Sequence, residues 1–380
     1  MAAAPMDGLR VIDFSTTVAG PWATRLMADC GAEVIKVEAA GEGDVLRHAP
    51  PIAGAMSRVF AQFNCGKKSV ALNLKSADGL AAARALMDGA DVVVENFRPG
   101  VMDRLGLGYS DATAGNPRLV YCSVSGFGQD GPLAGSAAYA PVVHAMTGFD
   151  AAMMAAQGAA PGDPPPAAGV MIADVVAASY AFGAVQAALL RRERFGCGAH
   201  VDVSLIEAMM SLVGIQYQEA QAPQPPRSTV FRPVCTLDGH MIVPLVTPRN
   251  YQGLFSVIGR PAWADDALIA SPGALSRRRR DIEDALGDWT RTRTSAECVE
   301  ALTAAGVACG AHAAPKDVLS HPHMAARGSF AELEDADGAF KVLNPPFRMT
   351  DAPCRARAGV ARLGEHTDEI LGALALPAGS

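Results

Sequence analysis

The sequence predicts an α/β fold with a parallel sheet, and two observations support this. In the first third of the chain, short apolar segments alternate with segments of helical pattern, which is the order expected when helices cross between parallel strands. At residues 221–233 the chain becomes rich in Pro, and a smaller region with a hairpin and several helices follows. We therefore expect a large domain over 1–220, a linker over 221–233 and a small α+β domain over 234–330.

The chain opens on a βαβ unit. Residues 9–15, LRVIDFS, form a short apolar strand, and residues 33–38, EVIKVE, form the next one. Between them, residues 19–32 predict a helix, because Pro21 stands near its first turn and Gly31 at its end. Strand, helix and strand in this order predict a parallel pair joined by a right-handed crossover.

The alternation continues beyond this unit. The further predicted elements are strands at 69–74, 91–96, 118–126 and 200–205 with a helix at 76–89, and after the Pro-rich linker a hairpin at 235–246 and helices up to about residue 325.

Composition and charge exclude several classes of protein. Half of the 380 residues are hydrophobic and 19% are charged, so the chain is not generally disordered. The net charge of -7 argues against nucleic acid as the main partner, because phosphate binding needs a basic face. A local basic pocket for a small anionic ligand is compatible with this charge.

The same survey predicts a cytoplasmic protein without a membrane segment or a metal site. The eight Cys are scattered and form no CxxC pair, so we expect reduced thiols. The opening residues MAAAPMDGLR lack the apolar core of a signal peptide, and we find no clean apolar span of about 20 residues. The histidines show no metal-ligand spacing.

Two phosphate-binding motifs are absent. The turn after the first strand reads STTVAGPW rather than GxGxxG, so a bound NAD is not expected. Residues 64–69, NCGKKS, lack the earlier Gly of a phosphate loop, which would fall at Ala61. We interpret the adjacent Lys67 and Lys68 as solvated surface, with the lining of an anionic site as the alternative.

A candidate binding loop follows the strand at 91–96. Asn96, Phe97 and Arg98 combine an amide, an aromatic face and a guanidinium at its carboxyl end, where ligands bind in open α/β sheets. Such a group can hold an adenine and a phosphate. On local sequence alone, a plain turn before Pro99 and Gly100 is the favoured alternative.

Asp174 is the candidate catalytic group. It is the only ionisable acid or base of residues 164–190 apart from Tyr180, and a lone carboxylate in apolar surroundings is costly unless it is hydrogen-bonded or has a shifted pKa. It could therefore be a nucleophile or an acid–base group, or equally the N-cap of the helix that follows. Among the histidines, only His144 is kept as a candidate, because it follows the loop GFGQDGPLAGSAAYAPVV.

Taken together, several segments resemble the class III CoA transferases, a superfamily whose fold also houses α-methylacyl-CoA racemase. The resemblance covers nearly the whole chain, and its order and spacing make it specific. The segments that carry it are LRVIDFSTTVAGPWATRLMADCGAEVIKVE, GEGDVLR, NCGKKSVALNLKSADG, ADVVVENFRPGVMDRLGLGY, NPRLVYCSVSGFGQDGP, GAHVDVSLIEAM and LGEHTDEIL.

The resemblance implies roles for particular residues. Asp174 stands at the position of the family's catalytic carboxylate, and Tyr139 matches a tyrosine that lines the acyl pocket of several members. Arg98 adds its guanidinium to the predicted CoA site on the local argument above. The CoA contacts that carry over from the family are Leu72, Lys75, Asn96, Phe97 and Arg104.

Three departures from members of the family argue against a formyl or oxalate enzyme. A basic residue that some family members place after the Val-Glu of IKVE is Ala39 here, a lysine of formyl-CoA transferase is Ala137, and its active-site glutamine is Val18. Its tetraglycine loop is also missing, and VPLVTPRNYQ stands roughly in its place. We expect Val18 to line the substrate pocket.

The resemblance implies a CoA transferase that moves CoA from an acyl-CoA to a carboxylic acid through intermediates on Asp174. It implies no permanently bound cofactor, since the CoA thioester is a substrate. The alternative is a racemase in which His144 is a second base, although the racemase Gly-His-Asp setting reads Ala138-Tyr139-Ala140 here. A non-catalytic CoA-binding protein is a third class, which the retention of Asp174 disfavours.

The family fold also implies an assembly. Its large domain is Rossmann-like and is completed by the returning C-terminal tail, here residues 331–380. Two ring-like chains interlock into a homodimer in this family, and the Pro-rich stretches at 221–233 and 344–346 fit the two crossings between domains.

Overall fold

A computed structural model describes residues 3–54, 56–160, 162–166, 168–222, 232–264 and 272–374. Its contacts divide the chain into two compact units. The first unit comprises Met1–Met153, Pro164–Gln218 and Pro322–Ser380, and the second comprises Met154–Asp163 and Glu219–His321. Most of the linker predicted at 221–233 lies outside the described residues, so that boundary stays a prediction.

The first unit is built on a six-stranded sheet in which every neighbouring pair is parallel, as the βαβ pattern predicts. In spatial order its strands are β5 (Lys68–Leu72), β2 (Glu33–Ala39), β1 (Arg10–Asp13), β6 (Val92–Glu95), β7 (Val120–Ser125) and β8 (Ala199–Ser204). The chain moves outward from β1 in one direction and then returns to build β6, β7 and β8 on its other side. This is the strand order of Rossmann folds.

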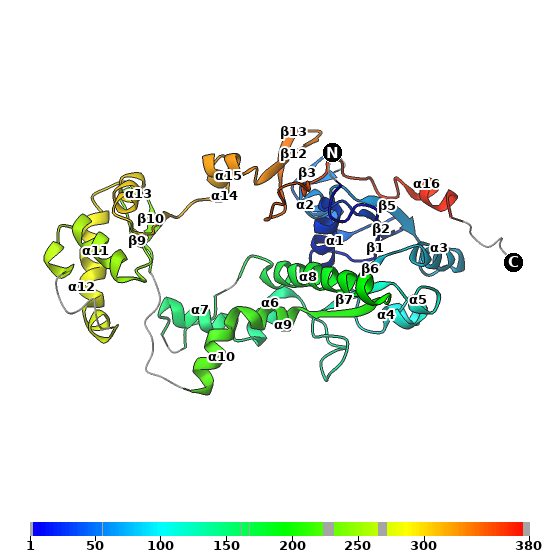
Figure 1. Ribbon diagram of the computed structural model, residues 1–380, viewed down its shortest axis with the longest axis horizontal. Coiled ribbons are helices and arrows are strands. Elements are labelled where there is room, and N and C mark those ends of the chain that lie inside the picture. Colours follow the sequence, from blue (N-terminus) through cyan, green and yellow to red (C-terminus); the bar gives the residue numbers. More distant parts are fainter. Residues whose placement is uncertain are drawn as a thin grey trace. The chain divides into compact units, whose positions relative to one another are not determined.

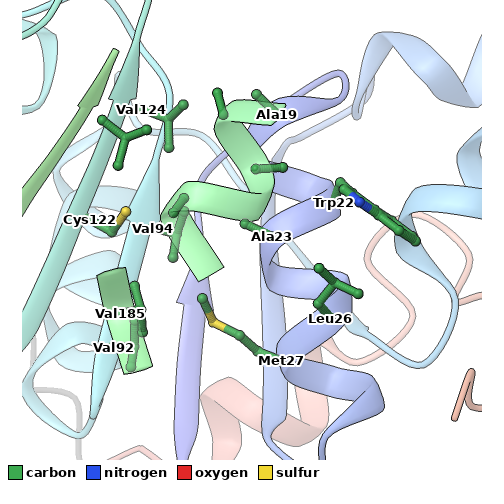
Figure 2. Packing of buried hydrophobic residues seen from close by; sticks show 14 of the residues in the cluster. Ala19, Trp22, Ala23, Leu26, Met27, Val92, Val94, Cys122, Val124 and Val185 are labelled. Carbon is green, nitrogen blue, oxygen red and sulfur yellow. The ribbon is translucent and has the colours of Figure 1, made fainter. Parts of the chain in front are cut away.

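Helices cover both faces of this sheet, because successive residues of its strands point to opposite sides. Val92 and Val94 face a core formed with α1 (Ala19–Asp29) and α8 (Ile172–Phe195), whereas Val93 faces a second core. Figure 2 shows the first core, where Ala23 and Met27 of α1 lie near Val92, Val94 and Cys122. The second core includes side chains of α3 (Ala77–Asp88), α4 (Val101–Arg104) and α5 (Tyr109–Gly115).

The remaining elements of the first unit are short. They are η1 (Val45–His48), β3 (Ile52–Ala53), β4 (Met56–Ser57), α2 (Arg58–Asn64), α6 (Ala140–Met146), α9 (Leu205–Met210), η2 (Ser211–Val213), α15 (Pro322–Arg327), β12 (Phe330–Asp335), β13 (Gly338–Leu343) and α16 (Thr367–Gly372). Helices α7 (Phe149–Gln157) and α10 (Gly214–Gln221) each begin in the first unit and end in the second.

Contrary to the expectation of no apolar span, one of the described helices, α8, is long and apolar enough to cross a membrane by length and composition. A core helix can pass the same test. In this unit α8 packs on the sheet through a row of small side chains that includes Ala173, Ala177 and Ala181, each fully buried.

The C-terminal segment returns to the outer edge of the sheet, where α16 lies beside β5 (Figure 1). The His366 N–H donates to the Ser69 carbonyl at 2.9 Å, and the Ala71 N–H donates to Oγ1 of Thr367 at 3.0 Å. The last described residues therefore complete the first unit.

The second unit holds a three-stranded sheet in which β10 lies between β9 and β11. The hairpin predicted at 235–246 is confirmed in type, because His240 pairs with Cys235 in an antiparallel register. The elements of this unit are β9 (Val234–Cys235), β10 (His240–Ile242), α11 (Pro248–Val257), η3 (Pro261–Ala264), α12 (Pro272–Thr290), α13 (Ser295–Ala304), β11 (Gly310–Ala311) and α14 (Pro315–Leu319).

Two predicted boundaries are corrected. The first strand ends at Asp13 rather than residue 15, because the Asp13 carboxylate takes the Ser15 N–H at 2.9 Å and turns the chain out of the sheet. The first helix ends at Asp29 rather than residue 32, because Gly31 adopts a φ of 115° and begins the turn into β2.

Candidate functional site

A cavity of about 460 Å³ lies at the carboxyl ends of β1, β6 and β7, within the first unit. This is where the strand order reverses, and open α/β sheets bind ligands at such a point. Its wall is formed by residues 16–19, 96–99, 124–126, 134 and 136–141 together with Leu46, Met171, Asp174 and Leu205.

The β1–α1 loop on this wall is held by buried charges. Lys67 forms an ion pair with Asp13 at 2.9 Å, and Lys36 forms one with Asp44 at 2.9 Å. Lys36 also donates a hydrogen bond to the Ser15 carbonyl at 2.6 Å. These four charged side chains are at most 5% exposed. The loop is therefore fixed by groups that have no access to water, which gives the cavity a rigid rim.

The buried pair has shifted pKa values. Burial by itself raises the pKa of Asp13, but Lys67, Lys36 and the Ser15 hydroxyl outweigh it and lower this pKa to about 2. Burial lowers the pKa of Lys67 to about 8, although Asp13 favours its charged form. The interpretation of Lys67 as solvated surface is thus wrong, while Lys68 is partly exposed and bridges Glu33 at 2.9 Å.

Asn96 joins the two halves of the crevice. Its Oδ1 accepts the Thr16 N–H at 2.8 Å, and its Nδ2 donates to the Thr16 carbonyl at 2.8 Å. The β6 loop is thereby fastened to the β1 loop across the point where the strand order reverses. Phe97 and Arg98 follow on the cavity wall, and Arg98 is exposed there.

Glu95 supports this loop from below. It is 4% exposed, and its carboxylate accepts the Phe97 N–H at 2.8 Å. Burial raises the pKa of Glu95 to about 7, against the opposing hydrogen bonds of Ser123 and the Phe97 N–H. Glu95 is not among the candidates predicted from the sequence. Its position at the end of a strand, next to the candidate loop, is the pattern that could have indicated it.

Asp174 lies on the cavity wall in the first turn of α8. The N-cap of this helix is Met171, so the interpretation of Asp174 as the N-cap is wrong. Burial raises the pKa of Asp174, and a hydrogen bond from its own backbone N–H opposes that rise. Among the described residues of the cavity wall, Asp174 is the only carboxylate and Arg98 is the only cation.

The predicted pocket residues occupy different positions. Val18 lies on the wall and is buried, and Tyr139 lies on the wall with a side chain 75% exposed. His144 is 1% exposed and does not line the cavity. Its Nε2 instead accepts the Ala173 N–H at 3.3 Å.

The other predicted CoA contacts lie outside the cavity wall. Leu72 is the last residue of β5 and is buried, whereas Lys75 and Arg104 are exposed in the segments that follow β5 and β6. The structure therefore brings together Val18, Asn96, Phe97, Arg98, Tyr139 and Asp174, and leaves Leu72, Lys75, Arg104 and His144 off this wall.

Glycine permits one close contact at the site. A Cβ added at Gly126 would lie 2.2 Å from Cβ of Ala138, so no side chain fits between the end of β7 and the opposite wall.

Among the described residues, no group of three or more His, Cys, Asp or Glu side chains could hold a metal ion.

A family model described as CoA-transferase family III matches residues 6–367. Curated relatives include a succinate–glutarate CoA-transferase of Agrobacterium fabrum, which is 32% identical over 97% of this chain and 96% of the relative. An acetyl-CoA:oxalate CoA-transferase of Acetobacter aceti is 34% identical over 95% of this chain and 93% of its own length.

Solved structures are similar over the same extent. A CAIB/BAIF family protein from Brucella suis has a TM-score of 0.84 and 29% identity, and covers 98% of this chain and 99% of that one. The protein Rv3272 of Mycobacterium tuberculosis has a TM-score of 0.86 and 30% identity, over 97% of this chain and 100% of that chain.

Proposed function

Because the chain belongs to CoA-transferase family III, we propose that it moves CoA from an acyl-CoA thioester to a second carboxylic acid through covalent intermediates on Asp174. The observation that carries this proposal is the position of Asp174, which is the single carboxylate among the described residues that line the cavity where the strand order reverses. No metal or permanently bound cofactor enters the proposed reaction.

The proposed reaction begins with an attack on the donor. The Asp174 carboxylate adds to the thioester carbonyl carbon, the carbon–sulfur bond breaks, and CoA leaves as a thiolate from a mixed anhydride. The thiolate then attacks the aspartyl carbonyl of that anhydride and releases the donor acid as its carboxylate. The enzyme now holds CoA as an aspartyl thioester.

The acceptor carboxylate reverses these steps. It attacks the aspartyl thioester carbonyl and expels the thiolate, and the thiolate then attacks the acceptor carbonyl of the new anhydride. The acceptor leaves as its CoA ester and Asp174 is restored as a carboxylate. Division of one exchange into several acyl transfers is the usual benefit of covalent catalysis.

The environment of Asp174 suits a nucleophile. Partial burial removes water from the carboxylate and raises its pKa, while its place in the first turn of α8 favours the ionised form that attacks. Mainly small and apolar side chains surround it on the wall, including Val18, Ala137 and Met171. Apolar neighbours of this kind lower the access of water to an anhydride formed on Asp174.

The racemase alternative needs a second base in the pocket, and the geometry of His144 argues against it. The Nε2 lone pair of His144 is occupied by the Ala173 N–H, and the ring is not part of the cavity wall. Tyr139 does lie on the wall, but a phenol is a poorer general base than the imidazole that the racemase reaction would use.

For CoA itself we propose Leu72, Lys75, Asn96, Phe97, Arg98 and Arg104 as the contacts. Asn96 contributes mainly by fastening its loop, since both its amide atoms already bond to Thr16. Phe97 and Arg98 border the cavity, and the exposed Lys75 and Arg104 supply positive charge for phosphate groups.

We further propose that two copies form an interlocked homodimer and that the enzyme is cytoplasmic. Large apolar side chains are exposed along α8 and near it, among them Met171 at 51%, Tyr180 at 51%, Leu190 at 54% and Phe195 at 72%. A second copy that covers them would account for this exposure. Light scattering should give a dimer at micromolar protein concentration, and a stable monomer would remove this part of the proposal.

Hydroxylamine trapping tests the proposed reaction. After incubation of the protein with an acyl-CoA alone, hydroxylamine should convert Asp174 into its hydroxamate, and peptide mass spectrometry should locate the adduct. Asp174→Ala should abolish both adduct and turnover while keeping CoA binding. The matched control is Asp111→Ala, which removes an exposed carboxylate from α5.

Each alternative predicts a different result. A racemase would give no adduct and would exchange the α-proton of the acyl group with deuterated water. A non-catalytic protein would bind CoA with neither adduct nor exchange. Turnover retained by Asp174→Ala would remove this residue from the mechanism.

A further inference from the structure

The first turn of α8 is held by a side chain from another helix. The first N–H groups of a helix have no partner inside it, and the N-cap Met171 provides no side-chain acceptor. The Ile172 N–H donates to the Val170 carbonyl at 3.0 Å, and the Ala173 N–H donates to Nε2 of His144 at 3.3 Å. His144 therefore takes the place of a cap one residue before Asp174.

This hydrogen bond joins two walls of the cavity. His144 belongs to α6, and Ala140 and Pro141 at the other end of that short helix line the cavity together with the preceding Tyr139. Asp174 lines it from α8. A contact between His144 and Ala173 thus fixes the distance between the wall that carries Tyr139 and the wall that carries the carboxylate.

The contact requires a neutral imidazole. Because Nε2 accepts, the single proton of the ring is on Nδ1. Nδ1 is buried and has no hydrogen-bond partner among the residues that the structure describes, and the Phe149 ring lies 5.6 Å from the imidazole, centroid to centroid. A doubly protonated ring would direct an N–H at the Ala173 N–H and would place a positive charge at the positive end of the helix dipole.

A buried donor without a partner lowers stability. In His144 this donor is Nδ1, while Nε2 of the same ring holds the start of α8. Such a residue is better suited to orient a neighbour than to exchange protons with a substrate, since neither nitrogen reaches the cavity wall.

We propose that His144 is a positioning residue, which holds the first turn of α8 so that the Asp174 carboxylate faces the acyl carbon. This inference rests on the proposed function of Asp174. Reacting groups that move out of line by about 1 Å can lose about 100-fold in rate, although the substrate still binds. Loss of the Nε2 acceptor should therefore lower kcat far more than it changes KM.

Two variants separate the hydrogen bond from the imidazole. His144→Gln places an amide oxygen at nearly the reach of Nε2 and cannot serve as a base, whereas His144→Met has similar length and no comparable acceptor. The control is His312→Met, at an exposed histidine of the second unit. For each full-length variant we would measure kcat and KM for the acyl-CoA and the hydrogen–deuterium exchange of residues 171–175.

The Met variant should lose about 100-fold in kcat, change KM by less than about threefold, and lose exchange protection at the start of α8. The Gln variant should stay within about threefold of the unmodified enzyme and keep that protection. A Gln variant as slow as the Met variant would overturn the proposal, because the imidazole itself would then be required. Full kcat or unchanged protection in a folded Met variant would also overturn it.

The proposed function of Asp174 and the positioning role of His144 are tested by different measurements. A protein without adduct or transfer would remove the proposed function, while the exchange of residues 171–175 would still decide whether His144 holds α8. If the Met variant does not fold, the Gln variant decides, because a folded Gln variant with a 100-fold loss contradicts positioning.

Discussion

Glu95 makes the stability of the first unit depend on pH near neutrality. Its carboxyl group ends β6 at 4% exposure, and burial raises its pKa from 4.5 to about 7. Asp103 and Asp202 act in the same direction, whereas the Phe97 N–H and Ser123 favour the charged form. Substitution with Gln keeps the shape and the acceptor for the Phe97 N–H but removes the titration.

The direction and size of this pH dependence follow from the linkage between proton binding and folding. The pKa of Glu95 is higher in the folded protein than in the unfolded chain. The contribution of protonated Glu95 to the free energy of unfolding is therefore complete below pH 4.5 and is lost as the pH rises through about 7. At about 1.4 kcal/mol for each pH unit between the two pKa values, the loss is about 3 kcal/mol in total. Between pH 5 and 8 it is about 2 to 3 kcal/mol.

Urea unfolding followed by circular dichroism at several pH values provides the assay. Between pH 5 and 8 the free energy of unfolding of the unmodified protein should fall by about 2 to 3 kcal/mol more than that of Glu95→Gln. Asp111→Asn, at an exposed position, should follow the unmodified protein. If the Gln variant and the unmodified protein have parallel pH profiles, the reasoning about Glu95 is wrong.

Three further predictions concern the loop between β1 and α1 and the residues that hold it. Lys67→Met should lower the free energy of unfolding by about 3 to 5 kcal/mol in urea, because Asp13 is left buried without its partner, while Lys68→Met at a partly exposed pair should cost less than about 1 kcal/mol. Asn96→Ala removes both bonds across the crevice and should raise KM for acyl-CoA several-fold in steady-state kinetics; an unchanged KM would contradict this. Gly20→Ala would place a Cβ 2.1 Å from that of Ser15 and should lower the free energy of unfolding by about 1 to 3 kcal/mol. Thermal melting measures this, and an unchanged melting temperature would contradict the prediction.

The sheet could be predicted from the sequence because its strands are short apolar runs between helices. Val92–Glu95 and Val120–Ser125 fall inside the predicted ranges 91–96 and 118–126. The end of β1 could not be predicted, since it depends on a hydrogen bond from the Ser15 N–H to Asp13. Local patterns indicate which residues are apolar, but not which side chain ends a strand.

The site was predictable where its chemistry is local. Asp174 stood out as a lone acid in an apolar stretch, and Asn96 to Arg98 follow a strand directly. Burial of Lys67 cannot be predicted from the sequence, because its partner Asp13 lies 54 residues away, and the contact of His144 with Ala173 likewise spans 29 residues. Only the folded chain brings such groups together.

The return of the C-terminal segment has a consequence for synthesis on the ribosome. The hydrogen bonds that join β5 to residues 364–367 connect positions 295 to 297 residues apart. At about 5 to 20 residues per second, the edge of β5 emerges on the order of 15 to 60 s before the segment that covers it. During that interval a nascent chain exposes an unpaired strand edge, which is a site for chaperones or for association with other chains.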